Sequence, residues 1–364
     1  MRGGQLGGLG VYLNVRWSVD RRDKSPQGAW ISSADSSRAM PTVRLENTEL
    51  HYELSGTGPR LLILSPSNTA LRDMKPYFSS YSQLTSKFCC LFFDHRGTGA
   101  SGMPNEQWPD PSMTVLANDT LAVLDAVGWE SCHVLGLSFG GMVAQELVIA
   151  RPSVVESLLL VCTSAAVGVE VHCSYPLETL LNLSAEERSE SLLLLADVRR
   201  DRGWLASSEG SGAMEFVLRA DAQVERSAGA SAGRRWQLRA RATHDAVRRL
   251  RSALVKPERT VRTAVFGAVH DGLTPPAAAS QLSSALGPAD AAGGPVWFNT
   301  GHWPNLIREE PAKFVRAVEH FVKHGALASE TKLESSYLEA AIDWSRSSST
   351  RDCCVLTQPE CCIL

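Results

Sequence analysis

Short apolar runs alternate with longer amphipathic stretches along the chain. The runs have the length and continuous hydrophobicity of strands buried in a sheet, and they cover residues 42–45, 50–54, 61–64, 88–93, 132–135 and 157–162. The stretches between them repeat apolar residues at helical spacing and predict helices over about 74–86, 113–126 and 141–150. The first two runs flank Glu46-Asn47, which predicts a hairpin. This alternation predicts an α/β fold: a mostly parallel central sheet with helices on both faces.

The alternation stops near residue 165 and resumes at 261–266. A last strand is expected at 295–298, and an amphipathic helix at 311–324. The residues in between are helical in pattern and rich in Arg, Ala and Glu. Within them, residues 184–187 (Ser-Ala-Glu-Glu) have the spacing of a capped helix start. A helical segment inserted between strands of a sheet predicts a cap over the sheet edge.

These patterns divide the chain into four parts. Residues 40–165 and 256–324 are predicted to form the core, and residues 166–255 the helical cap. Residues 1–39 are rich in Gly, Ser and Arg without hydrophobic periodicity, and predict a disordered N-terminal extension. Residues 325–364 predict a polar tail, with one helix near 332–344.

Composition and charge narrow the class of protein. The chain has 364 residues, of which 44% are hydrophobic and 21% charged, as in ordinary globular proteins. A net charge of −3 gives no electrostatic reason to expect a nucleic-acid partner. No apolar run is long enough to span a membrane, and no secretory h-region is present, so we expect a cytoplasmic protein. The cysteines lack the spacing of a zinc site, and neither a metal nor a cofactor is predicted.

The segment Gly136-Leu137-Ser138-Phe139-Gly140 lies between a predicted strand and a predicted helix. A serine on a sharp strand-to-helix turn between glycines has the arrangement of a nucleophile elbow. The glycines are required because a Cβ atom would not clear its neighbours in so tight a turn. The helix N-terminus behind Ser138 favours developing negative charge. Ser138 is therefore the predicted nucleophile.

A serine nucleophile needs a base that removes its proton and an acid that orients the base. Asp271 follows the strand 261–266, and His302 follows the strand 295–298, so both are expected at the carboxyl edge of the sheet. Their order after the serine also fits the expected Ser, Asp, His sequence. The alternatives are a helix-capping role for Asp271, and His270 in place of His302 as the base.

An oxyanion hole requires two backbone N–H groups. Phe139, directly after the nucleophile, is predicted to supply one. The other is expected from the loop after the strand 61–64, where Pro66 has no N–H group. Ser67 is the predicted donor, with Asn68 as the alternative.

The residues 42–324 resemble the α/β-hydrolase superfamily. The resemblance rests on three motifs in order: Asp94-His95-Arg96-Gly97-Thr98-Gly99 after the fourth strand, the Ser138 elbow, and the Asp271/His302 pair. The branch that is most similar holds 3-oxoadipate enol-lactonases, small esterases and cofactor-free haloperoxidase-like proteins. In that branch the Asp-x-Arg-Gly turn is structural, and many members carry His-Gly where this chain has Ser65-Pro66.

The resemblance implies a serine hydrolase that cleaves an ester, lactone or thioester of a small-molecule acyl substrate. Trp303 and Met142 are expected to line its substrate pocket. Two alternatives stay open. One is a carbon–carbon bond hydrolase with the same triad, and the other is a weakly catalytic ligand-binding receptor on the same fold.

The chain ends in Cys361-Cys362-Ile363-Leu364, which fits a prenylation box of the geranylgeranyl type on Cys361. Neighbouring cysteines offer sites for a second, palmitoyl anchor, which stable membrane attachment requires. This pattern predicts association with the cytoplasmic face of a membrane. The alternative is a tail whose cysteines are incidental.

Overall fold

A computed structural model describes the chain over 41–74, 83–168, 173–226, 228–256, 259–286 and 294–326. The extension over 1–39, the tail with its helix at 332–344 and Cys361, and most of the predicted helix 74–86 lie outside the described residues.

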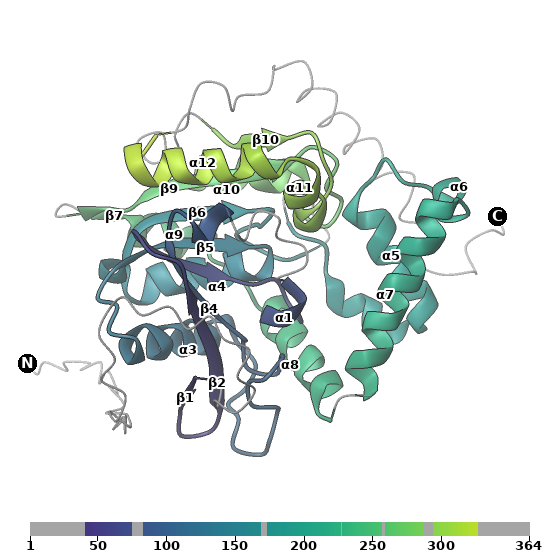
Figure 1. Cartoon of the computed structure of the whole chain (residues 1–364), viewed down its shortest axis with the longest axis horizontal. Coiled ribbons are helices and arrows are strands. Elements are labelled where there is room, and N and C mark those ends of the chain that lie inside the picture. The colour runs from purple at the N-terminus through teal and green to yellow at the C-terminus, as the bar shows by residue number, and fades with distance from the viewer. Residues whose placement is uncertain are drawn as a thin grey trace, which may run out of the picture.

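The core is one eight-stranded sheet in the order β1-β2-β4-β3-β5-β6-β9-β10 (Figure 1). Strands β1 and β2 form the expected hairpin, β2 pairs antiparallel with β4, and the other neighbours are parallel. The predicted α/β class is thus confirmed. The strands are β1 (Thr42–Arg44), β2 (Glu49–Ser55), β3 (Arg60–Leu64), β4 (Cys89–Phe93), β5 (Cys132–Leu137), β6 (Val155–Val161), β9 (Arg262–Ala268) and β10 (Val296–Phe298).

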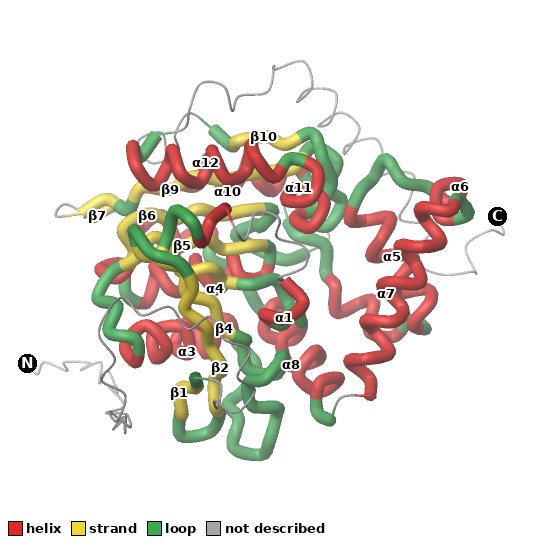
Figure 2. Tube along the Cα trace, viewed as in Figure 1, coloured by secondary structure: helices red, strands yellow, loops and turns green. Residues whose placement is uncertain are grey.

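Helices cover both faces of the sheet, and each face has its own apolar cluster (Figure 2). One cluster contains residues of α3 (Met113–Ala126), α4 (Phe139–Ala150), α9 (Val247–Leu254) and α10 (Pro276–Leu286). The other contains residues of α1 (Leu71–Met74), α11 (Trp303–Glu309) and α12 (Pro311–His324). Buried strands with apolar side chains on both faces explain why β3 and β5 are continuous hydrophobic runs.

Local sequence signals explain where several helices begin and end. The Ser112 side chain accepts a hydrogen bond from the Val115 N–H at the start of α3. The capping box predicted at residues 184–187 is present at the start of α5 (Ala185–Ala196). Gly325, with φ of 68°, ends α12. The predicted bounds of α3 and α12 are confirmed.

The residues between β6 and β9 form a mainly helical layer beside the sheet, on the right in Figure 1. The helices α5, α6 and α7 stand together there, and α8 returns toward the core. We refer to this layer as the cap. It consists of the 3₁₀ helix η3 (Leu177–Asn182), α5, α6 (Arg202–Leu205), α7 (Ser208–Arg226) and α8 (Ala230–Ala242).

Three small elements complete the described structure. The 3₁₀ helix η2 (Pro152–Val154) precedes β6, and β7 (Val255–Lys256) pairs with β8 (Arg259–Thr260) as a separate two-stranded ribbon. Across the described ranges, no helix has the combination of length and hydropathy that a membrane span requires.

Candidate active site

Ser138 lies between β5 and α4 in a conformation that most residues avoid, with φ of 53° and ψ of −115°. The glycines around it permit this turn. A Cβ atom on Gly140 would lie 2.2 Å from the Leu64 carbonyl oxygen, and one on Gly136 would lie 2.6 Å from the Gly141 Cα atom. The turn therefore packs directly against the end of β3. Strain of this kind is typical of functional residues.

The structure brings together the three residues predicted as a triad. His302 Nε2 lies 3.0 Å from Ser138 Oγ, and His302 Nδ1 lies 2.6 Å from Asp271 Oδ2. A carboxylate only accepts hydrogen bonds, so the Nδ1–H group donates to Asp271 and leaves Nε2 able to accept the serine proton. His302 and Asp271 are buried, and Ser138 is partly exposed. This arrangement is suited to proton transfer from the hydroxyl.

Two further groups hold Asp271. The Thr274 N–H donates to Asp271 Oδ1 at 2.8 Å, so Asp271 does cap the following turn as well as contacting His302. The Cys162 thiol also hydrogen-bonds to Asp271. Burial, followed by the negative charge of Asp271, raises the pKa of Cys162 well above its ordinary value. Cys162 is therefore a neutral thiol that donates to the carboxylate.

Cys162, Asp271 and His302 also form the one group of potential metal ligands among the described residues, with ligand atoms within 4.8 Å of one another. The hydrogen bonds above already use the facing atoms of Asp271 and His302. A thiol with a raised pKa is a poor source of the thiolate that a metal prefers. We therefore interpret this group as part of the hydrogen-bonded relay.

The expected oxyanion donors lie next to the elbow. Phe139 begins α4, where N–H groups have no acceptor within the helix. Ser67 is partly exposed in the loop after β3, and its N–H group has no acceptor within the described residues. The Asn68 N–H is already bound to Gln237 Oε1 at 2.9 Å. Of the two loop candidates, Ser67 is thus the one whose N–H group has no acceptor among the residues that the structure describes.

The remaining sequence candidates occupy different surroundings. Trp303 follows His302 and is partly buried, whereas Met142 is buried in the apolar cluster one turn beyond Ser138. His270 pairs with Asn299 at 2.9 Å, away from the serine. His95 is fully buried against Phe139, and burial lowers its pKa to about 4. Only His302 among these histidines contacts Ser138.

The model of the alpha/beta hydrolase family matches residues 67–317, which is more than half of the chain. The protein belongs to the alpha/beta hydrolase family. The match spans the elbow, Asp271 and His302, and it includes the cap.

Named relatives are similar to this alpha/beta hydrolase over part or all of their length. The "Putative carbamate hydrolase RutD" of Azorhizobium caulinodans is 33% identical over 122 residues, which cover 34% of this chain and 44% of that protein. The chain thus spans less than half the length of this curated relative. The enol-lactonase from Burkholderia xenovorans LB400 has a TM-score of 0.59 and 20% identity, covering 78% of this chain and 100% of the other. A meta-cleavage product hydrolase from Pseudomonas fluorescens IP01 has a TM-score of 0.58 and 18% identity, covering 76% and 94%.

The Asp-x-Arg-Gly turn of this hydrolase makes structural contacts. Asp94 accepts hydrogen bonds from the backbone N–H groups of Leu71 and Ala100, at 2.7 and 2.8 Å. Arg96 makes two 2.6 Å bonds to the buried Asp119. These contacts give Asp94 and Arg96 a role in shaping the loops.

The cap is bound by its backbone to both loops that carry the triad. The Ala196 carbonyl accepts a 2.6 Å hydrogen bond from the His302 N–H, and the Leu195 carbonyl accepts one of 2.9 Å from the Gly272 N–H. The Val198 N–H donates to the His270 carbonyl at 2.9 Å. The position of His302 therefore depends directly on the cap. We refer to residues 195–198 as the docking strip.

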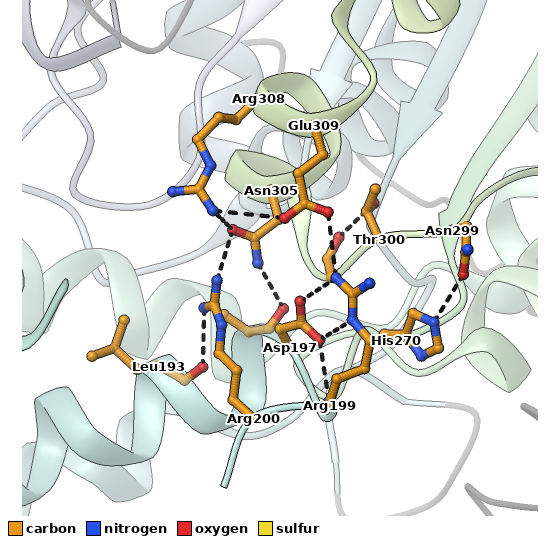
Figure 3. Close-up of polar contacts among 12 residues, drawn as sticks. Leu193, Asp197, Arg199, Arg200, His270, Asn299, Thr300, Asn305, Arg308 and Glu309 are labelled. Atoms are coloured by element: carbon orange, nitrogen blue, oxygen red, sulfur yellow. Dashed lines mark hydrogen bonds and ion pairs between the residues drawn. The ribbon is translucent and has the colours of Figure 1, made fainter. Parts of the chain in front are cut away.

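A polar cluster holds the docking strip in place (Figure 3). Asp197 is buried and receives two hydrogen bonds from the Arg199 guanidinium, at 2.9 and 2.6 Å. Burial would raise the pKa of Asp197, but the bonds from Arg199 outweigh burial and lower it. Arg199 and Arg200 then reach Glu309 and Asn305 of α11, at 3.3 and 3.4 Å. The cap and the helix that follows His302 are thus joined by charge-assisted bonds.

Sequence reasoning missed Gln237, the docking strip and Asp197. Gln237 and the docking strip act through contacts between segments far apart in the chain, for which a single sequence gives no spacing signal. Asp197 bonds to Arg199 two residues away, but a pair at that spacing does not indicate that it lies next to the loop of His302. The available signal was the polar Gln237 in a predicted helix whose neighbouring positions include the apolar Trp236 and Ala240. A polar residue among apolar neighbours indicates a buried hydrogen bond without identifying its partner.

Proposed function

We propose that this protein is a serine hydrolase that cleaves an ester, lactone or thioester through an acyl-enzyme on Ser138. The observation that carries the proposal is the unbroken chain of hydrogen bonds from Ser138 Oγ through His302 to Asp271, at 3.0 and 2.6 Å. A serine hydroxyl becomes a nucleophile only when a base at this distance removes its proton. The strained turn at Ser138 supports the same role.

In the proposed reaction, Ser138 attacks the substrate carbonyl while His302 takes the serine proton. The N–H groups of Phe139 and Ser67 and the N-terminus of α4 stabilise the oxyanion of the tetrahedral intermediate. His302 then returns the proton to the leaving group, and water cleaves the acyl-enzyme by the reverse sequence of proton transfers. The names of the relatives, which include a carbamate hydrolase and an enol-lactonase, are consistent with this class.

Labelling with a fluorophosphonate probe tests the nucleophile. We expect the purified protein to gain one adduct, located on Ser138 by peptide mass spectrometry. The Ser138→Ala variant should not label, whereas Ser131→Ala, which changes a serine that donates to the exposed Glu156, should label as the wild type does. An unlabelled wild type, or equal labelling of Ser138→Ala, contradicts the proposal and favours a receptor that binds without turnover.

Kinetics on a panel of short-chain esters, lactones and thioesters tests the roles of the partners. We expect His302→Ala and Asp271→Asn each to lower kcat by roughly 10⁴-fold, because both changes remove the oriented base. Unfolding midpoints close to that of the wild type would show that the losses are chemical. Losses below tenfold for both variants would contradict the proposed triad.

A further inference from the structure

Cys162 follows the last residue of β6 in a backbone conformation that favours glycine. Its φ is 46°, and its side chain is buried. A left-handed backbone is costly for a residue with a Cβ atom. The backbone is nevertheless bound on both sides, because the Cys162 N–H donates to the Phe266 carbonyl at 2.8 Å and the Cys162 carbonyl accepts from Thr274 Oγ1 at 3.1 Å. Strained residues that are held in this way are concentrated at functional sites.

The Cys162 thiol contacts both loops that carry the partners of Ser138. Its Sγ atom, a carboxylate oxygen of Asp271 and a ring nitrogen of His302 all lie within 4.8 Å of one another. The thiol donates a hydrogen bond to Asp271 and accepts one from the Trp303 N–H. A thiol is able to do both, since it has one S–H donor and a sulfur acceptor. One side chain thus joins the loop after β9 to the loop after β10.

Two consecutive backbone N–H groups hold His302. The His302 N–H donates to the Ala196 carbonyl of the cap at 2.6 Å. The next N–H along the chain, that of Trp303, donates to Cys162 Sγ. Trp303 is the first residue of α11, where N–H groups have no acceptor within the helix, so the thiol supplies one. The imidazole is therefore carried by a backbone that is bound to the cap by one N–H and to Cys162 by the next.

Asp271 and its loop are also bound to Cys162. The Asp271 Oδ1 atom accepts from the Thr274 N–H at 2.8 Å, and the Oδ2 atom lies 2.6 Å from His302 Nδ1. The Thr274 hydroxyl donates to the Cys162 carbonyl and also lies 3.0 Å from Ser174 Oγ. Cys162 thus binds the Asp271 loop twice, through its thiol and through its carbonyl. The short bond between Asp271 and His302 spans two loops that share this one anchor.

We propose that Cys162 is a positioning residue of the triad, which sets the separation of Asp271 and His302 at which their hydrogen bond forms. The inference rests on the proposed function, because it concerns the base that activates Ser138. Cys162 acts through these two residues and takes no proton in the reaction. The effect is large enough to measure, since a misplacement of about 1 Å in an active site can lower a rate by about 100-fold.

Kinetics on the best substrate of the ester, lactone and thioester panel test the inference. Cys162→Ala removes both bonds of the thiol, and should lower kcat by about tenfold while KM stays within about twofold, because the change misplaces the base without touching the substrate. Cys162→Ser keeps a donor and an acceptor on the same Cβ atom, and should recover kcat to within about threefold of the wild type. A serine variant as slow as the alanine variant overturns the inference.

A matched cysteine variant separates positioning from packing. Cys132→Ala removes another fully buried thiol, at the opposite end of β5 from Ser138. It should lower the unfolding midpoint, because it leaves a cavity in the core, and keep kcat within about twofold of the wild type. Equal losses of kcat in Cys132→Ala and Cys162→Ala overturn the inference.

Thr274→Val is a second test, which holds even if Cys162→Ala does not fold. It removes the hydroxyl that binds the Cys162 carbonyl and keeps the Thr274 N–H bond to Asp271. We expect kcat to fall by about threefold, because the Asp271 loop loses one of its two bonds to Cys162. Ser174→Ala leaves the bond between Thr274 and Cys162 in place, and should keep kcat within about twofold of the wild type. A wild-type kcat in Thr274→Val contradicts the inference.

Proton NMR gives a readout that does not depend on turnover. The His302 Nδ1–H group, in its 2.6 Å bond to Asp271, should give a downfield resonance that is assigned by its absence in His302→Ala. Cys162→Ser should keep this resonance, whereas Cys162→Ala should shift it upfield or broaden it through exchange with water. A folded Cys162→Ala variant that keeps the wild-type resonance or the wild-type kcat overturns the inference.

The two proposals fail in different ways. Normal labelling of Ser138, with a resonance that does not depend on Cys162, refutes the positioning role and leaves the hydrolase proposal standing. An unlabelled Ser138, with a resonance that does depend on Cys162, refutes the hydrolase proposal and leaves the positioning of His302 standing.

Discussion

Gln237 shows how one amide connects the cap to the candidate oxyanion loop. Its side chain is completely buried. The amide oxygen accepts from the Asn68 N–H at 2.9 Å, while the amide nitrogen donates to the Arg96 carbonyl at 2.9 Å and to Thr98 Oγ1 at 2.6 Å. The amide thus fixes the loop next to Ser67 against the turn that follows β4. Gln237 is therefore a positioning residue, which supports the proposed chemistry by holding the loop that carries the Ser67 N–H group.

Replacing Gln237 by Leu should lower kcat by about tenfold, because the loop that carries the Ser67 N–H loses its support. The free energy of unfolding should fall by about 2 kcal/mol, since the partners of the amide are left buried without hydrogen bonds. Ester kinetics and urea unfolding measure the two effects. Thr98→Val is the matched control: it removes one partner of the amide and keeps the Asn68 bond.

Thr98→Val should therefore lose stability while keeping a kcat within about twofold of the wild type. If kcat falls equally in both variants, Gln237 acts only through stability and the positioning role is wrong.

The residues of the candidate triad were predictable because their signals are local. Ser138 lies in a glycine-rich turn between a strand and a helix, and Asp271 and His302 each follow a strand. Parallel strands bring their carboxyl ends to one edge, so order along the chain was enough to bring these residues together. Gln237 has no comparable signal. Its partners depend on how α8 crosses the core, which is set by tertiary packing.

At the scale of elements, the docking strip ties the cap to the two loops that follow β9 and β10. Its backbone pairs with His270 and Gly272 on one loop and with His302 on the other. Glycine is required at the contact, because a Cβ atom on Gly301 would lie 2.2 Å from the Ala196 carbonyl oxygen. Cap and triad are therefore positioned by the same hydrogen bonds.

Replacing Asp197 by Ala should loosen this strip. We expect a loss of about 1–3 kcal/mol in the free energy of unfolding, because the buried Asp197 carboxylate and its part-buried hydrogen bonds to Arg199 disappear. We also expect a fall of about tenfold in kcat, because His302 loses part of its support. Ester kinetics at temperatures below the unfolding transition measure the change in kcat, and thermal denaturation measures the change in stability.

Glu309→Gln is the control for Asp197→Ala, since it weakens only partly exposed contacts, to Arg199 at 3.3 Å and to Arg308 at 3.6 Å, and leaves Asp197 in place. Its effect on stability should stay below about 1 kcal/mol. An unchanged kcat in Asp197→Ala would mean that the strip does not support His302.

The sequence predicted which strands and helices are present better than it predicted their first and last residues. The run 157–162 predicted a strand through Cys162, but β6 ends at Val161 because Cys162 has a left-handed φ of 46°. The helix predicted from residue 141 begins at Phe139, because α4 starts directly after the strained serine. Hydrophobicity reports burial, whereas strand and helix ends depend on backbone turns that it does not encode.

At the scale of the whole molecule, Glu146 joins three parts of the structure. It lies on α4, accepts two hydrogen bonds from Arg249 of α9 at 2.8 and 2.6 Å, and lies 3.5 Å from His244 after α8. Burial would raise the pKa of Glu146, but the close contact with His244 and the hydrogen bonds from Arg249 outweigh it and lower the pKa to about 2. The folded state therefore binds a proton on Glu146 less readily than the unfolded chain does.

This lowered pKa makes a prediction for stability against pH. The stabilisation from ionised Glu146 is fully present above its ordinary pKa of 4.5 and is lost as the pH falls toward 2. Its size is on the order of 3 kcal/mol. The difference in unfolding free energy between the wild type and Glu146→Gln should be large at pH 7 and shrink between pH 4.5 and 2. Urea titrations across this range measure it.

Groups remote from Glu146 titrate alike in both proteins, so their contributions cancel in the difference, whereas His244, whose pKa burial lowers and Glu146 raises, belongs to the same coupled unit. Asp125→Asn, which breaks the exposed pair with Arg151, should change stability by less than about 1 kcal/mol at any of these pH values. A Glu146→Gln difference that stays constant down to pH 3 would contradict the coupling.

The contact between Gly233 of α8 and Gly97 of the core has a consequence for engineering chimaeras. A Cβ atom on Gly233 would lie 2.1 Å from the Gly97 carbonyl oxygen, so the two backbones touch. A foreign cap grafted onto this core must bring a glycine at that point and an amide one turn later. Among the described residues, no glycine of the outer helices α6 and α7 has such a contact with the core. These two helices could therefore be exchanged more freely than α8.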